Sequence, residues 1–304
     1  MTSQSTLLRE TDRIERIPLA ETVEISVVVP HYYSSRDPNV RQLVNDLRIQ
    51  SVKNIEVLIA HGISPQGKAI NAGARAAKGS ILVVMDDDSR IGHSRVIENL
   101  TKVIRENPDV AMAGASLVTP ENANAFQREA AKQFPRFNMP VIKEIVDSDL
   151  ACHGCVAFRK DVFMRAGMER EDIIRGLDPD LRVRLRKAGY RVVLAPDSWF
   201  YHPFPENFGK FIRLFYRNGY GSAYLQVVHP EMSYDTDETL RSDLFVSKRS
   251  FLYRAFRFPL RLAKAIVKFE WLRFSGYCVY LIGYLVGFIR FKFFAQQRRL
   301  NFLL

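Results

Sequence analysis

Short β-branched runs, each followed by a helical pattern, constrain the fold of this chain more than any other feature. Ile25–Pro30, Ile55–Ala60 and Ile81–Met85 are apolar runs with the length of a buried strand. Helical patterns follow the first two runs at about residues 37–47 and 67–78. Strands that alternate with helices predict an α/β fold, with a mostly parallel sheet flanked by helices.

The alternation continues to about residue 227, with a less regular stretch at residues 120–150. The patterns predict a helix near His93–Arg105, a strand near Val110–Ala115, a strand at Val156–Phe158, a helix at Asp180–Ala188, a strand at Arg191–Leu194 and a longer helix at Phe208–Val227. We therefore divide the chain into a polar lead-in of residues 1–23, an α/β domain of residues 24–235 and a C-terminal segment of residues 236–304.

The positive charge of the chain is concentrated at its C-terminal end. Residues 248–304 contain twelve Lys or Arg and one acidic residue, Glu270, which accounts for the whole net charge of +11. The first 247 residues hold 32 basic and 32 acidic residues. Because the basic segment is also rich in Phe, Tyr and Leu, we expect it to contact an anionic membrane surface and no nucleic acid.

The apolar part of this segment is short for a membrane span. Phe274–Ile289 comprises 16 uncharged residues between Arg273 and Arg290, whereas a spanning helix needs about 20. Its glycines and tyrosines also weaken it as a span. We expect an interfacial or re-entrant helix, and a helical hairpin packed on the body or a tilted short span are the alternatives.

Cysteine usage and the first residues indicate a cytoplasmic location. The three cysteines cannot all pair, which is typical of a reducing compartment. Residues 1–21 contain no apolar run that would act as a secretory signal. Together with the basic segment, these features predict a peripheral or monotopic protein on the cytoplasmic face of the cell membrane.

Three consecutive aspartates follow the third predicted strand. Aspartates at the carboxyl end of a buried strand lie where open α/β sheets bind their ligands. Asp86 and Asp88 share one face of an extended segment, and adjacent carboxylates repel one another unless a cation is bound. Mg²⁺ or Mn²⁺ bridging a diphosphate suits such oxygen ligands. A solvated acidic loop is the alternative.

Four motifs in order resemble the inverting family 2 glycosyltransferases of the GT-A fold, which is Rossmann-like. They are Val27–Pro30; the helix with Gly67-Lys68-Ala69, Asn71, Gly73 and Ala77-Lys78-Gly79, which leads to the Asp triplet; Gly154–Arg159; and Asp178-Pro179-Asp180-Leu181 with Arg184-Leu185 and Ala188-Gly189-Tyr190. The match runs from about residue 25 to residue 225. The resemblance implies a GT-A domain that uses a nucleotide-sugar donor, with UDP-sugars as the commonest choice, and a divalent metal.

The resemblance also implies roles for individual residues. It places the catalytic base at Asp178, with Asp180 as the second candidate. Asp88 would bind the metal directly, Asp86 would contact the ribose or a metal-bound water, and His202 would complete the metal ligands. From the residues alone, Asp178 could instead cap the helix after Pro179, and a lone histidine is more often structural.

Other residues are assigned to the donor and acceptor sides. The predicted donor contacts are Pro30, Tyr32, His61, Lys68, Asn71, Asp86, Asp87, Arg213 and Arg217; the predicted acceptor side is Cys152, His153 and Gly154, where small residues would let a sugar approach. Surface positions are the alternative for Lys68 and for Arg213 and Arg217, which share a helix face.

The chain departs from the family pattern at three places. The second strand ends in Ala60-His61-Gly62-Ile63-Ser64 where the family has Asp-Asp-Gly-Ser, His31-Tyr32-Tyr33 replaces the usual Tyr-Asn, and Asn218 replaces the Trp that follows an arginine in processive synthases. The first two departures predict an unusual pocket for the base, and the third favours transfer of a single sugar. Cys152 and Cys155 do not supply the four ligands of a structural zinc site.

We therefore expect a metal-dependent, hexosyltransferase-like inverting enzyme with a glycan or lipid-linked acceptor. The alternative is a catalytically degenerate GT-A domain that binds a membrane or a partner. A nucleotidyltransferase is disfavoured because no glycine-rich phosphate loop follows the first strand.

Overall fold

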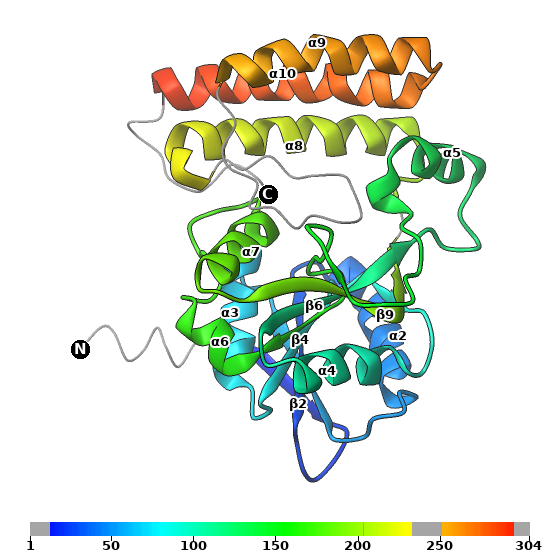
Figure 1. Ribbon diagram of the computed structural model, residues 1–304, viewed down its shortest axis with the longest axis vertical. Coiled ribbons are helices and arrows are strands. Elements are labelled where there is room, and N and C mark those ends of the chain that lie inside the picture. The colour runs from blue at the N-terminus through cyan, green and yellow to red at the C-terminus, as the bar shows by residue number, and fades with distance from the viewer. Residues whose placement is uncertain (1–12, 203, 233–250, 295–304) are drawn as a thin grey trace. The chain divides into compact units, whose positions relative to one another are not determined.

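The computed structural model describes residues 13–202, 204–232 and 251–294. These residues form two compact units (Figure 1). The first, which we call the sheet unit, holds residues 13–121 and 135–202. The second, the helical unit, holds residues 122–134, 204–232 and 251–294.

The sheet unit is built on a nine-stranded mixed sheet. The strands are β1 (Ile14–Pro18), β2 (Ile25–His31), β3 (Ile55–His61), β4 (Ile81–Val84), β5 (Arg90–Ile91), β6 (Val110–Val118), β7 (Val146–Asp147), β8 (Val156–Arg159) and β9 (Arg191–Tyr201). Their order is β1-β3-β2-β4-β8-β6-β9-β5, and β7 pairs with β9. The fold class predicted from the sequence, an α/β sheet with flanking helices, is confirmed.

The central strands are parallel, and β8 is the exception. β2 pairs in parallel with both β3 and β4, and β6 pairs in parallel with β9. β8 lies antiparallel between β4 and β6. Because β8 is antiparallel to both β4 and β6, those two strands run in the same direction. The carboxyl ends of β2, β3, β4, β6 and β9 therefore all lie on one side of the sheet, which is where an open α/β sheet binds its ligands.

The core explains why these runs became strands. Val27, Val28 and Val29 of β2 and Val83 and Val84 of β4 are completely buried. Continuous apolar runs of this kind are typical of strands covered on both faces. The helices of this unit are α2 (Asp37–Arg48), α3 (Gln66–Ala76), α4 (Val96–Glu106), α6 (Lys160–Arg165) and α7 (Leu177–Lys187), with short 3₁₀ turns η1 (Ser34–Arg36) and η2 (Pro135–Phe137).

Part of the expected polar lead-in forms a strand. β1 pairs antiparallel with β3, in a register that places Glu15 opposite Ile59. Ile14 and Ile17 pack against the core. Among the described strands, β1 therefore forms the edge of the sheet next to β3, and residues 1–12 lie outside the described part of the chain.

The helical unit consists of α5 (Ala125–Gln133), α8 (Phe208–Val228), η3 (Pro230–Met232), α9 (Phe251–Val267) and α10 (Trp271–Phe294). Figure 1 shows α8, α9 and α10 running side by side. The α/β domain predicted from the sequence, residues 24–235, includes α8, whereas the contacts of α8 with α10 place it in the same compact unit as the C-terminal helices.

Glycines bring α8 and α10 together. A Cβ atom on Gly219 would overlap the carbonyl oxygen of Tyr280, and one on Gly283 would overlap that of Tyr216. Small residues let two helix backbones approach closely in this way. The glycines of α10, which make it less suited to span a membrane, therefore have a role in packing against α8.

α10 is longer than its uncharged part. It has 24 residues, and at 1.5 Å per residue it extends about 36 Å, against about 30 Å for the hydrocarbon core of a bilayer. Among the described residues, it is the one helix long and apolar enough to cross a membrane, and little of it is buried. The interfacial or re-entrant placement expected for this segment stays a prediction.

Candidate active site

The carboxyl ends of β2, β3, β4 and β9 gather the polar residues of the sheet unit. β2 ends in His31 and β3 ends in His61, and these two residues are in register. The three aspartates follow β4 after Met85, and His202 follows β9. Sheet topology thus brings residues that are more than 100 positions apart in the chain to one edge.

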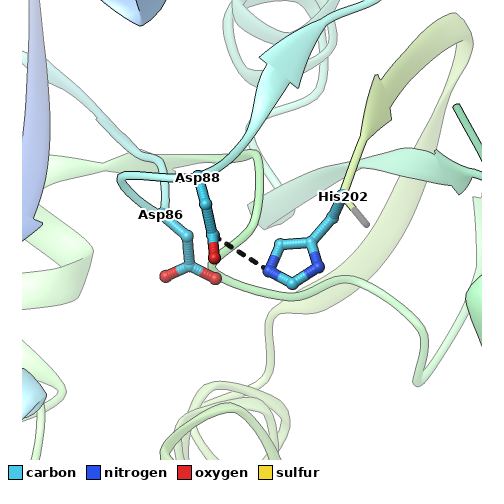
Figure 2. A group of neighbouring side chains, drawn as sticks. All are labelled: Asp86, Asp88 and His202. Carbon is cyan, nitrogen blue, oxygen red and sulfur yellow. Dashed lines mark ion pairs between the residues drawn. The ribbon is translucent and has the colours of Figure 1, made fainter. Parts of the chain in front are cut away.

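Asp86, Asp88 and His202 form a cluster that could hold a metal ion. One ligand atom from each residue lies within 4.8 Å of the other two. Figure 2 shows the carboxylate of Asp88 facing the imidazole of His202, with His202 Nε2 3.0 Å from Asp88 Oδ1, and the carboxylate of Asp86 beside that of Asp88. Two carboxylates and one imidazole suit Mn²⁺, and Mg²⁺ less well because it prefers oxygen ligands.

The two carboxyl groups of this cluster have pKa values that are shifted in opposite directions. Burial raises the pKa of Asp86 to about 6, with the charges of Asp88 and Asp178 adding to the rise and His202 opposing it. Burial also acts on Asp88, but the hydrogen bond and charge of His202, together with Arg36, bring its pKa below the usual value. A cation bound between the carboxylates would relieve the repulsion that burial strengthens, so these residues fit a divalent metal.

Asp87 is held by side chains from β2 and η1. It is buried, and His31 Nδ1 lies 2.9 Å from Asp87 Oδ2. Arg36 Nη1 donates to Asp87 Oδ1 at 2.6 Å and lies 3.2 Å from Asp88 Oδ2. The other ring nitrogen of His31 bonds Asp37. The structure therefore gives Asp87 a role in fixing the loop, and its predicted contact with the donor has no support from this geometry.

One carboxylate oxygen of Asp178 is bound by His153. The backbone N–H of His153 donates to Asp178 Oδ1 at 2.8 Å, and His153 Nδ1 lies 3.0 Å from the same oxygen. His153 Nε2 lies 2.9 Å from Glu169 Oε1. Although burial opposes it, the charges of Asp178 and Glu169 raise the pKa of His153 to about 9, so at neutral pH a buried imidazolium lies between two carboxylates.

The two acidic residues of α7 have different environments. α7 begins at Leu177 with Gly176 as its N-cap, so Asp178 is not the helix cap that the sequence left open. Asp180 is buried, and its Oδ2 accepts from Arg184 Nε at 2.7 Å. Its carboxylate is occupied by this ion pair, which argues against Asp180 as the catalytic base. The Asp178 side chain is 30% exposed and is the better placed of the two.

The sequence matches the model of a known family, glycosyltransferase-like family 2, over residues 4–221. The chain belongs to this family. A search of curated proteins finds no match. Among solved structures, the chain is similar to the mannosyltransferase PcManGT from Pyrobaculum calidifontis in complex with GDP-Man and Mn²⁺, with 14% identity, a TM-score of 0.53 and coverage of 97% of this chain and 95% of that chain.

A weaker likeness, to S. aureus TarS, has 12% identity, a TM-score of 0.46 and coverage of 67% of this chain and 40% of that chain. At such identities, the likeness to the mannosyltransferase shows a shared GT-A fold alone. The resemblance proposed from the sequence motifs is confirmed by the family match.

Two predicted donor residues of this glycosyltransferase lie on α3. Asn71 is buried, and its side chain bonds the backbone of Glu169 in both directions, at 2.8 and 2.9 Å. This use of the amide assigns Asn71 to holding the segment that carries Glu169 rather than to the donor. Lys68 lies half-buried on the first turn of α3. Its contact with donor phosphates stays a prediction.

The predicted acceptor-side turn is partly explained by packing. A Cβ atom on Gly154 would overlap the ring of Phe200, so glycine is required there by the core rather than by a ligand. Burial raises the pKa of Cys152 to about 12, and the charges of Asp178 and Asp86 add to the effect. The Cys152 thiol is therefore a poor nucleophile and metal ligand at neutral pH.

The remaining predicted donor residues divide between the two units. Pro30 lies in β2, and Tyr32 and His61 line a cavity of the sheet unit, described below. Arg213 and Arg217 are exposed on one face of α8 in the helical unit. Their relation to the carboxylates of the sheet unit stays a prediction.

Three residues that contact this candidate site were not predicted from the sequence. They are Arg36, Gln66, whose Nε2 donates to Asp86 Oδ1 at 2.8 Å, and Glu169. Gln66 directly precedes the Gly67-Lys68 motif, which was a usable signal. Arg36 and Glu169 carry no motif, and only the pairing of β2 with β4 and the packing of residue 169 against α3 reveal them.

Proposed function

We propose that this protein transfers a sugar from a nucleotide-sugar donor to an acceptor hydroxyl with inversion at the anomeric carbon. One observation carries the proposal: a carboxylate cluster suited to a divalent cation and a separately held carboxylate, Asp178, belong to one site. The register of β4 and β8, which pairs Val84 with Val156, sets the aspartate loop beside the turn of His153, whose backbone N–H binds Asp178. This arrangement supplies a place for the leaving diphosphate and a base for the acceptor.

Asp178 is assigned the removal of the proton from the acceptor hydroxyl. His153 binds its Oδ1 through both a backbone and a ring N–H, which leaves Oδ2 to accept the proton. The acceptor oxygen then bonds to the anomeric carbon as the bond from that carbon to the diphosphate breaks. The departing diphosphate keeps the bonding electron pair, and attack from the opposite side inverts the configuration.

Asp86, Asp88 and His202 would hold a Mn²⁺ or Mg²⁺ ion. When bound, such an ion neutralises charge that develops on the departing diphosphate. Arg36 is a further cation beside these carboxylates, with Nη1 3.2 Å from Asp88 Oδ2, and its half-exposed guanidinium suits phosphate oxygens of the donor. The structure of a similarly folded mannosyltransferase is a complex with GDP-Man and Mn²⁺, which supports a metal here.

The donor is expected to be a UDP-sugar on family frequency, and the acceptor to be a glycan or a lipid-linked molecule. The direct test is a donor panel of UDP-glucose, UDP-N-acetylglucosamine, UDP-galactose and GDP-mannose with alkyl glycosides and lipid extracts as acceptors. We expect release of nucleoside diphosphate that requires Mn²⁺ and is abolished by EDTA. Proton NMR of the product should show the inverted anomer.

Other results of this assay would replace the proposal. Pyrophosphate release from a nucleoside triphosphate would indicate a nucleotidyltransferase. The absence of any metal-dependent nucleotide binding in calorimetry would indicate a degenerate GT-A domain that serves as a binding module. Retained anomeric configuration would remove Asp178 from the role of base.

We also propose that the helical unit attaches the enzyme to the cytoplasmic face of an anionic membrane. α9 exposes Leu252, Phe256 and Leu260 among basic residues, and α10 is an apolar helix with a basic C-terminal turn. Exposed apolar side chains interleaved with Lys and Arg are typical of helices at anionic membrane surfaces.

Vesicle flotation tests this attachment. The full chain should float with vesicles containing phosphatidylglycerol and less with pure phosphatidylcholine. The double variant Arg257→Glu, Arg261→Glu should reduce binding to the anionic vesicles, whereas the control Lys102→Glu, Arg105→Glu on α4 of the sheet unit should not. Release from cell membranes by high salt would indicate surface attachment, and a requirement for detergent would indicate that α10 spans. A full chain that floats with neither vesicle would refute the attachment.

A further inference from the structure

A carboxylate from β1 reaches the end of β3. Glu15 lies opposite Ile59 in the antiparallel pair of β1 and β3, and its side chain extends along the strand to His61. Glu15 Oε2 lies 2.7 Å from His61 Nε2. The backbone fixes this approach, because the His61 N–H donates to the carbonyl of Arg13 at 3.0 Å. The end of β3, which has no carboxylate of its own, thereby acquires one from the neighbouring strand.

This pair lines a cavity beside the aspartate cluster. The cavity has a volume of about 630 Å³, and its lining includes Glu15, His31, Tyr32, Arg41 and His61. Its size is that of a typical small-molecule site. His31 connects the cavity to the aspartates, since its ring bonds Asp87 on one side and lies edge-on to His61, with ring centroids 5.4 Å apart.

The groups in the cavity suit a planar ring with an N–H donor. Tyr32 is 39% exposed and offers an aromatic face for stacking. An ionised carboxylate only accepts hydrogen bonds. His61 occupies Oε2 of Glu15, so Oε1 is the oxygen that can face a ring placed against Tyr32. Uracil and guanine present a ring N–H at their pairing edge, whereas cytosine and adenine present a ring nitrogen lone pair that a carboxylate repels.

We propose that Glu15, positioned by His61, selects the base of the donor and admits those with a ring N–H, uracil or guanine, over cytosine and adenine. The inference rests on the proposed function, because the base belongs to the nucleotide-sugar donor. Glu15 acts as a specificity residue at the far end of the donor from the reacting carbon. His61 acts on the base through Glu15, as a positioning residue.

Calorimetry with UDP, GDP, CDP and ADP in the presence of Mn²⁺ tests the selection. We expect the wild-type chain to bind UDP or GDP on the order of tenfold or more tightly than CDP and ADP, since a hydrogen bond to a charged group is worth this much. Whether UDP or GDP binds more tightly distinguishes the two bases that share the N–H edge.

Glu15→Gln supplies the decisive comparison. An amide can donate to the ring nitrogen of cytosine and accept from its amino group, so this variant should lose on the order of tenfold for the preferred nucleotide and narrow or reverse the gap to CDP. Glu98→Gln on α4, which changes an exposed carboxylate bonded to Ser51, is the matched control and should leave all four affinities unchanged.

The outcomes separate this inference from the proposed function. Metal-dependent binding of all four nucleotides with equal affinity, or a Glu15→Gln variant with the wild-type order of affinities, would overturn the role of Glu15 and leave the transferase proposal standing. Failure of every nucleotide to bind in Mn²⁺ would overturn both. The thermal midpoint of Glu15→Gln should match that of the wild type, because the backbone pairing of β1 with β3 is kept.

Discussion

The aspartates after β4 and the carboxylates around His153 lie by the ends of two neighbouring strands, β4 and β8, but their charges are balanced in opposite ways. The first group is left with excess negative charge, and burial holds the pKa of Asp86 at about 6. In the second group, Asp178 and Glu169 enclose one buried imidazolium. This difference is the one expected if the first group takes up a cation from solution, as proposed above, whereas the second already carries a counterion that fixes a carboxylate in place.

Of the variants considered, replacement of Asp88 should have the largest effect on metal binding and turnover. Asp88→Asn removes a negative metal ligand and leaves a neutral amide beside His202, so Mn²⁺ binding and measurable turnover should both be lost, a fall of roughly 10³-fold or more in kcat/KM. Mn²⁺ titration by electron paramagnetic resonance measures the binding. Asp161→Asn on α6, an exposed carboxylate paired with Arg165, is the control. Metal-dependent turnover in Asp88→Asn near the wild-type rate would contradict the cation site.

Replacing Asp178 should separate catalysis from metal binding. Asp178→Asn keeps the shape of the side chain and removes the base, so kcat should fall about 10²- to 10⁴-fold. Affinity for Mn²⁺ and nucleoside diphosphate should stay near the wild-type value in calorimetry. Full activity in this variant would transfer the role of base to another residue.

Asp180→Asn provides the matched comparison on the same helix. Its carboxylate pairs with Arg184, so the variant should keep most of its turnover and lose roughly 2 kcal/mol of unfolding free energy. Urea denaturation followed by circular dichroism measures the loss. An Asp180→Asn enzyme that is stable but inactive would point to Asp180 as the base.

The buried imidazolium should appear as a pH dependence of stability. The pKa of His153 is about 9 in the folded chain, above the value of about 6.5 in an unfolded chain. Its ion pairs with Asp178 and Glu169 therefore contribute in full below pH 6.5, and the contribution, up to about 3 kcal/mol, is lost as the pH rises through 9. His153→Gln should flatten the fall in unfolding free energy between pH 6.5 and 9. An equally steep fall in the variant would assign the dependence to other groups.

Gln66→Ala should have the smallest effect. It removes the hydrogen bond to Asp86, worth about 1 kcal/mol, so Mn²⁺ affinity should change only a few-fold. Isothermal titration at a fixed pH measures the change, with Gln42→Ala on α2, which bonds Asp46, as the control. A change of a hundredfold or more would show that Gln66 binds the metal or the donor directly.

Local sequence patterns predicted where the strands lie in the chain better than which strands pair with one another. The runs that became β2, β3 and β4 were placed to within one residue, because β-branched runs bounded by polar residues have few other structures available. The insertion of β8 between β4 and β6 was not predictable from such patterns. This long-range pairing is what places the Cys152–Cys155 turn, and with it His153, beside the aspartates.

β1 was missed because an edge strand can look like a loop in a sequence. Its charged residues, Glu15 and Arg16, and its terminal Pro18 are tolerated at an edge, where side chains reach solvent and a backbone donor can be omitted. The site residues Arg36 and Glu169 were missed for a different reason. Arg36 reaches Asp87 and Asp88, and Glu169 reaches His153, through tertiary contacts, whereas Asp86, Asp88 and Asp178 lie in sequence motifs.

The short strand at the start of the described chain bears on how the protein can be handled. β1 covers the side of β3 that would otherwise present unpaired backbone groups. A version shortened to begin after residue 20 would uncover that row of donors and acceptors, and two such molecules could join edge to edge. Preparations trimmed at this end should therefore be checked for self-association before any loss of activity is read as a loss of catalysis.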